Sequence, residues 1–160
     1  MTGTSIYLKA ESLDGFKVTV QQIAQLLLKE CRVIFLSGPL GAGKTEFART
    51  WLREAGVTGR IKSPSFSIIE SYENTIYGKI HHLDLFRMNS ADDFRCLGIE
   101  EYLDDRLIIE WPEKGGGVIV KHDLEISIMV EGETRVIECK SHDTKMMNKL
   151  RSMQLNRHEN

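Results

Sequence analysis

Cysteine, long apolar runs and excess charge are all scarce in this 160-residue chain, and each scarcity excludes a class of protein. The 3 cysteines are far apart and form no CxxC pair or Cys/His cluster, which predicts free thiols rather than disulfides or a zinc site. No apolar run approaches the roughly 20 residues that a membrane helix requires. The start of the chain lacks the basic and apolar regions of a signal peptide. We therefore expect a cytoplasmic protein with no membrane contact.

The two signs of charge are nearly balanced, with 21 basic and 23 acidic residues and a formal net charge of −2. This balance argues against a chain that coats nucleic acid. A local basic face remains open, because Arg49, Arg53 and Lys62 form either such a face or an ordinary solvated helix surface. The length fits about one domain with a core of its own.

One segment matches the phosphate-binding pattern G-x-x-x-x-G-K-[ST]. Glycines in such a loop let backbone N–H groups turn toward phosphate oxygens. The lysine reaches the β- and γ-phosphates, and the hydroxyl that follows it binds Mg²⁺. An apolar strand predicted at 32–37 precedes the loop and a helix predicted at 44–55 follows it, which is the context such a loop requires. The residues assigned to this nucleotide site are Gly38, Pro39, Leu40, Gly41, Ala42, Gly43, Lys44 and Thr45.

Strands and helices alternate along the rest of the chain. Further predicted elements are a helix over 18–30, strands at 66–70 and 76–86 joined by a turn at 73–74, a broken helix over 91–105, a strand at 107–109, a flexible glycine turn at 115–117, a hairpin of 123–130 with 134–140, and a helix over 144–155. This order predicts an α/β fold of the P-loop NTPase type, with three layers (α/β/α), a mixed, mainly parallel sheet and an antiparallel C-terminal part. We expect residues 1–142 to form this domain and 143–160 to form a C-terminal helix or tail.

Two acids are candidates to work beside the metal ion. Glu110 directly follows an apolar strand, where the active cleft of such sheets opens. Strand alternation places Asp84 on one face with His82, and such polar groups need partners when they are buried. The spacing alone leaves open which acid holds the metal and which orients a water molecule. It also leaves open a solvated strand end for Glu110, and a core polar pair or an ion pair with Arg87 for Asp84.

Five motifs in this order resemble the TsaE family, formerly YjeE, whose members are small bacterial ATPases needed to make threonylcarbamoyladenosine at position 37 of tRNA. The resemblance spans about residues 18–136. The motifs are GPLGAGKT at 38–45, SPSF at 63–66, HLDLFR at 82–87, LGIEEYL at 97–103 and IEWPE at 109–113.

The resemblance implies roles for individual residues. Lys44 and Thr45 match the family's P-loop lysine and Mg²⁺ ligand, and Glu110 matches its second metal-associated acid. Asp84 matches the acid needed for ATP hydrolysis, and Trp111 matches the tryptophan of the EWP motif. Ser65 matches the switch-like hydroxyl of the SPTF motif. Glu113 and Arg135 match positions that contact nucleotide. The chain departs from the family where Ser65 replaces threonine, which keeps the hydroxyl, and where Phe86 replaces tyrosine, which loses one.

The resemblance also implies a reaction and partners. We expect an ATP hydrolase that is weak alone, uses ATP and Mg²⁺, and drives or resets a threonylcarbamoyl transferase subunit together with its paralogous partner protein, so that tRNA is reached only through the complex. A small-molecule P-loop kinase is the alternative, but the arginine-rich lid of such enzymes is missing between Arg106 and Arg135. A GTP-driven switch is a third reading, and the nearest string to its N-K-x-D motif is 148–151, which ends in Arg151.

Overall fold

The computed structural model describes residues 4–119 and 121–158 of the chain. In chain order its elements are β1 (Ile6–Ala10), α1 (Leu13–Leu27), β2 (Val33–Ser37), α2 (Lys44–Glu54), β3 (Ile69–Thr75), β4 (Gly78–Asp84), α3 (Ala91–Arg95), η1 (Ile99–Tyr102), β5 (Arg106–Glu110), η2 (Pro112–Gly115), β6 (Leu124–Glu131), β7 (Thr134–Lys140) and α4 (Thr144–His158), where η marks a 3₁₀ helix.

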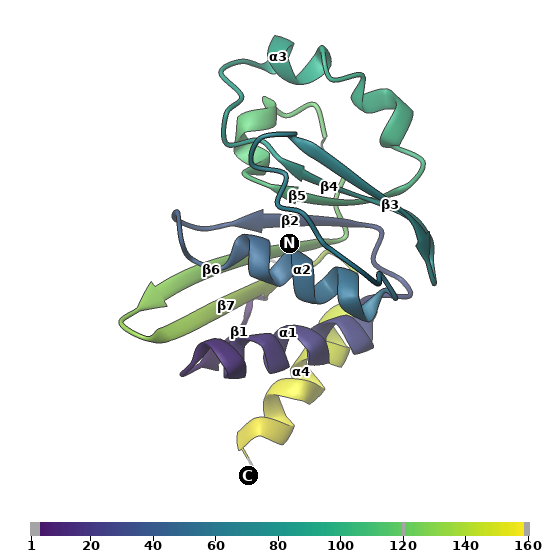
Figure 1. Ribbon diagram of the computed structural model, residues 1–160. Helices are drawn as coiled ribbons and strands as arrows, with labels where there is room; N and C mark the ends of the chain where they lie inside the picture. Colours follow the sequence, from purple (N-terminus) through teal and green to yellow (C-terminus); the bar gives the residue numbers. More distant parts are fainter. Residues whose placement is uncertain (1–3, 120, 159–160) are drawn as a thin grey trace.

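The strands form one seven-stranded sheet in the order β1-β7-β6-β2-β5-β4-β3. The four middle strands, from β6 to β4, are parallel to their neighbours, and the strands outside them pair antiparallel. Figure 1 shows α1, α2 and α4 on one face of this sheet and α3 on the other. Helices must cover both faces because parallel strands are buried on both sides. The structure therefore confirms the predicted three-layer α/β class with a mixed sheet.

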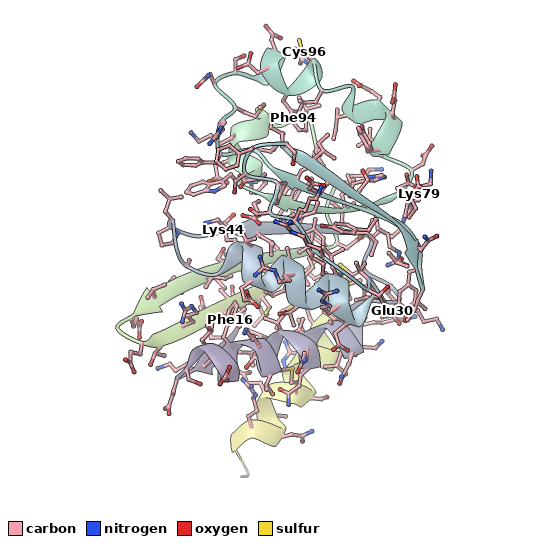
Figure 2. The ribbon with its side chains drawn as sticks, viewed as in Figure 1. Phe16, Glu30, Lys44, Lys79, Phe94 and Cys96 are labelled. Carbon is pink, nitrogen blue, oxygen red and sulfur yellow. The ribbon has the colours of Figure 1, made fainter. Side chains whose placement is uncertain are left out.

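Alternation along the buried strands divides the apolar core in two. Ile34 and Leu36 of β2 belong to the cluster beneath α1, α2 and α4. Val33 and Phe35 of the same strand pack against the second cluster, beneath α3 and the 3₁₀ helices. Phe16 and Phe94, labelled in Figure 2, are fully buried members of the two clusters on opposite faces. Strand β2 is thus fixed from both sides just before the chain enters the phosphate loop.

Several element boundaries differ from the sequence prediction. Helix α1 begins at Leu13, earlier than predicted, because the Ser12 hydroxyl caps it by accepting the Gly15 N–H. The predicted hairpin turn at 73–74 is wrong, since β3 continues through Thr75 and the chain turns at 76–77. Strand β1 was not predicted, and it exists through its antiparallel pairing with β7.

The C-terminal helix packs onto the sheet domain. Contacts join α4 to both β1 and α1. Its buried side chains Met146, Leu150 and Met153 belong to the larger core cluster. The predicted division at residue 142 stays a prediction, although this packing gives α4 a share of the same core. None of the helices formed by residues 4–119 and 121–158 combines the length and the apolar character needed to cross a membrane.

Candidate functional site

The parallel strands β2, β5 and β4 end together and carry the predicted site at their carboxyl ends. Leu36 of β2 pairs with Glu110 of β5, and Glu110 pairs in turn with Asp84 of β4. The chain leaves β2 through the phosphate loop and enters α2 at Lys44. Two acids from separate sequence motifs and the phosphate loop are therefore neighbours, as the sheet topology of this fold class requires.

The phosphate loop depends on its glycines. Gly38, Gly41 and Gly43 all have positive φ angles, of 144°, 76° and 116°. A Cβ atom on Gly38 would lie 2.5 Å from the carbonyl oxygen of Ile128, so no larger residue fits there. The Arg135 guanidinium, from β7, donates a hydrogen bond from Nε to the Ala42 carbonyl oxygen at 2.9 Å and fixes the loop from behind. Glycine backbone freedom and this arginine together shape the loop.

Lys44 extends across the loop. Its Nζ donates hydrogen bonds to the carbonyl oxygens of Gly38 at 2.7 Å and Pro39 at 2.9 Å. The Trp111 ring lies beneath the same ammonium, with 4.3 Å between Nζ and the ring centroid. Burial lowers the pKa of Lys44, and the carboxylates of Glu110 and other nearby acids oppose this shift. A cation is therefore held at the position where phosphate charge would be bound.

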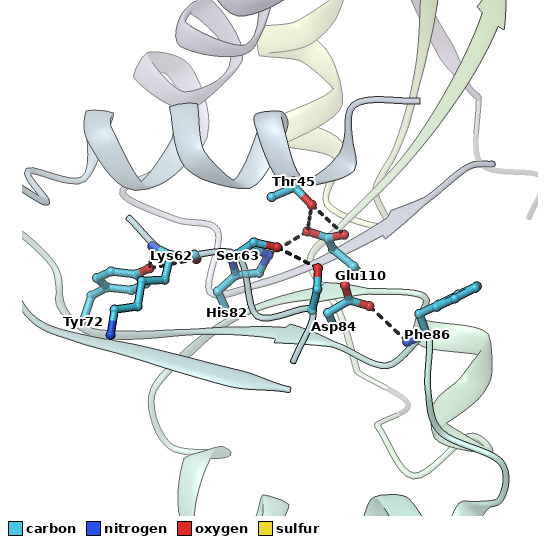
Figure 3. A network of polar contacts seen from close by, with 9 residues as sticks. Thr45, Lys62, Ser63, Tyr72, His82, Asp84, Phe86 and Glu110 are labelled. Atoms are coloured by element: carbon cyan, nitrogen blue, oxygen red, sulfur yellow. Dashed lines mark hydrogen bonds and ion pairs between the residues drawn. The ribbon is translucent and has the colours of Figure 1, made fainter. Parts of the chain in front are cut away.

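Glu110 is the centre of the polar network in Figure 3. Its carboxylate accepts a hydrogen bond from the Thr45 hydroxyl, with distances of 3.0 and 3.2 Å to its two oxygens. On its other side, His82 Nε2 lies 2.8 Å from Glu110 Oε1, and both side chains are almost fully buried. His82 Nδ1 has no partner within residues 4–119 and 121–158. The hydrogen-bond partner of His82 is therefore Glu110, and the core polar pair that the sequence left open for Asp84 is not the arrangement formed.

Asp84 lies beside Glu110 with a different environment. The Phe86 backbone N–H donates to Asp84 Oδ1 at 3.0 Å. Burial raises the pKa of Asp84, and the neighbouring Glu110 adds to this rise, while the Phe86 hydrogen bond lowers it. Among the described residues no ion pair joins Asp84 to Arg87, whose guanidinium lies instead over the Phe66 ring. Asp84 is thus a buried acid with one free carboxylate oxygen facing the site.

These groups line one open cavity of about 310 Å³. The predicted site residues in its wall are Leu40, Gly41, Gly43, Lys44, Thr45, Ser65, Asp84, Glu110 and Trp111. Glu46, Phe86 and Arg87 also line it, although they are not among the predicted site residues. Trp111 reaches the cavity because its backbone is left-handed, with φ of 57°, which turns the chain sharply after β5.

The other predicted residues lie outside the cavity wall. Gly38, Pro39 and Ala42 form the loop backbone, and Arg135 supports it from β7. Glu113 is exposed on η2. Nucleotide contact by Glu113 and Arg135 stays a prediction. In the string at 148–151, Lys149 pairs with Glu30 at 2.8 Å and belongs to α4, so this string forms part of the helix packing.

The chain is similar in sequence to a known protein family. The family model described as "Threonylcarbamoyl adenosine biosynthesis protein TsaE" matches residues 11–137. Proteins named "tRNA threonylcarbamoyladenosine biosynthesis protein TsaE" are similar to this chain. The one from Haemophilus influenzae is 36% identical over 74% of this chain and 78% of its own. The one from Treponema pallidum is 32% identical over a region that covers 65% of this chain and 77% of that relative. The one from Rickettsia felis is 38% identical over a region that covers 64% of this chain and 59% of that relative.

A solved structure shares the fold. The crystal structure of YdiB from Bacillus subtilis superimposes with a TM-score of 0.73. It covers 100% of this chain and 99% of the other, at 23% sequence identity. The two chains therefore share the same fold.

Replacement of Asp84 by asparagine is expected to stabilise the protein. An acid whose pKa is raised on folding destabilises the folded state once it ionises, so the wild type loses stability as pH rises from the ordinary carboxyl pKa through the raised value. Asp84→Asn keeps the oxygen that accepts the Phe86 N–H and removes the charge. We expect a melting temperature about 2–4 °C higher at neutral pH, measured calorimetrically without nucleotide.

The gain should vanish at acid pH, where Asp84 is protonated in both states. Asp92→Asn is the matched control, because Asp92 on α3 is exposed and its ion pair with Arg95 lies at the surface, where such pairs contribute little to stability. A variant that melts at or below the wild-type temperature at neutral pH would contradict the burial cost assigned to Asp84.

Proposed function

The chain belongs to the TsaE family, and on that premise we propose that it is an ATPase required for formation of the threonylcarbamoyl group on adenosine 37 of tRNA. It binds ATP with Mg²⁺ and hydrolyses it to drive or reset a complex of a threonylcarbamoyl transferase subunit and its paralogous partner protein. The observation that carries the ATPase proposal is the Glu110 carboxylate, placed between the Thr45 hydroxyl and Asp84 at the phosphate loop.

The residues present fit a magnesium ion. Thr45 and Glu110 offer oxygen ligands within 3.2 Å of each other, and Mg²⁺ in phosphate-binding sites is held by a few such oxygens together with substrate phosphates and water. A bound Mg²⁺ would neutralise negative charge on the phosphates. His82 holds Glu110 in the orientation that this role requires, because its Nε2 lies at hydrogen-bonding distance from Oε1.

The other side chains act on ATP and water. Backbone N–H groups of the loop and the start of α2 bind the phosphates, and Lys44 balances their charge. Asp84 orients the attacking water, since one of its carboxylate oxygens is left free by the Phe86 hydrogen bond and its raised pKa makes it a better base. Trp111, which lies against both Lys44 and Phe86, covers the phosphate end of the site.

Reconstitution of tRNA modification tests the function. Purified transferase subunit, paralogous partner and tRNA, supplied with a threonylcarbamoyl donor, are assayed with wild-type chain, without it, and with Lys44→Ala. We expect sustained modification only with wild type and ATP. Because a charged hydrogen-bonding group is removed, Lys44→Ala should bind ATP about tenfold or more weakly in calorimetry and fail to support modification. Equal modification without the chain would overturn the proposal.

Turnover by the isolated chain tests the metal assignment. Glu110→Gln keeps an oxygen for His82 and Thr45 but loses the charge, and Glu110→Ala removes both. We expect both variants to bind nucleotide and to lose Mg²⁺-dependent hydrolysis by about 100-fold. Normal turnover in Glu110→Ala would remove this residue from the metal site. Transfer of phosphate to a metabolite rather than to water would favour the kinase alternative, and preferential binding of GTP would favour a GTP-driven switch.

A further inference from the structure

A second hollow lies beside the nucleotide cavity. It has a volume of about 550 Å³, and we call it the α2–β3 groove; the residues used below are Arg49, Arg60, Lys62, Ser63, Phe66 and Glu70. The groove runs from α2 to the start of β3 and is open to solvent. Neither the phosphate loop nor the two site acids line it, so it is separate from the candidate ATP site.

Phe66 is the most unusual side chain in this groove. It is 83% exposed, more than any other large apolar side chain that the structure describes. The Arg87 guanidinium lies 4.5 Å from its ring centroid in a cation–π contact. An exposed aromatic ring next to an arginine matches the residue types enriched in protein interfaces, namely aromatic residues and arginine.

The groove carries a small positive excess. Arg49, Arg60 and Lys62 face a single acid, Glu70. Arg49 already forms an ion pair with Glu46 at 2.7 Å. Within residues 4–119 and 121–158, neither Arg60 nor Lys62 has an ion-pair partner, and both are exposed. The available charge is therefore about two cations beside one exposed aromatic ring.

We propose that the α2–β3 groove and Phe66 form the docking surface for a carboxylate-bearing face of a partner protein. An RNA backbone carries dense, regular charge and calls for a longer run of cations without acids among them, whereas Glu70 and the paired Arg49 leave only two. The groove would match a partner surface that places a few carboxylates opposite Arg60 and Lys62 and an apolar side chain against Phe66. The identity of this partner rests on the proposed function, which makes it the transferase complex.

Residues 63–66 contribute to both the docking surface and the candidate ATP site. Ser65 lines the nucleotide cavity, while Ser63 and Phe66 line the groove, and the hydroxyls of Ser63 and Ser65 lie 2.7 Å apart. The turn that carries Phe66 is stabilised by a hydrogen bond from the Ile68 N–H to the Pro64 carbonyl oxygen at 2.8 Å. The Ile68 carbonyl oxygen in turn accepts a hydrogen bond from the Asp84 N–H at 2.9 Å. Figure 3 shows Ser63 on the strip of chain that passes Asp84 and Glu110. Docking is therefore expected to depend on the bound nucleotide.

Binding to the purified transferase subunit and its paralogous partner tests the surface, in the presence of a non-hydrolysable ATP analogue. We expect Arg60→Glu/Lys62→Glu and, separately, Phe66→Ala to weaken the dissociation constant about tenfold or more. Arg60→Gln/Lys62→Gln should give an intermediate loss. ATP affinity, basal hydrolysis and melting temperature of these variants should equal those of wild type, since none of the replaced residues lines the nucleotide cavity.

Matched controls lie on α4, which packs on β1 and α1. Lys145→Glu/Arg151→Glu makes the same charge change, and Leu155→Ala removes an exposed apolar side chain. Both should bind the partner like wild type. Equal binding by the groove variants and wild type would overturn the docking surface alone. Loss of tRNA binding with partner binding kept would assign the groove to RNA instead. If wild type itself did not bind the pair, the partner named in the proposed function would fail together with this surface.

Discussion

The buried carboxylate of Glu110 joins three elements that are distant in sequence. It ends β5, accepts a hydrogen bond from the first turn of α2 through Thr45, and contacts His82 of β4. A charge with 2% exposure is costly unless such partners surround it. Because the partners come from the phosphate-loop helix and a neighbouring strand, this one group connects the loop to the ends of two strands.

The same carboxylate also disfavours the charged form of a neighbouring acid in the site. Asp84 is its neighbour in register, and the Glu110 carboxylate adds to the burial that raises the pKa of Asp84. Lys44 offsets part of this repulsion, although its own charge is also disfavoured by burial. The protein therefore places two acids and one lysine close together, and the Lys44 ammonium is the cation among them. Sites built for catalysis commonly give up some stability in this way.

The candidate site could be predicted from the sequence to a large extent because its residues obey local rules. The glycines and Lys44 form a contiguous motif, Glu110 follows from its place directly after an apolar strand, and Asp84 follows from strand alternation. The features that were missed depend on distant parts of the chain. Strand β1 forms only against β7, and the pairing of His82 with Glu110 requires two strands in register. The left-handed backbone of Trp111, which directs its ring toward Lys44, follows no residue preference.

Arg135 holds the phosphate loop from β7, far along the chain from the loop itself. During synthesis the loop residues leave the ribosome long before Arg135 does, and β6, which flanks β2, is also made late. A nascent chain with a complete motif thus lacks the support that shapes it, and long-range strand pairing of this kind is slow to form. The loop therefore reaches its final shape only after β6 and β7 have been made, so its geometry depends on the C-terminal part of the sheet as well as on its own glycines.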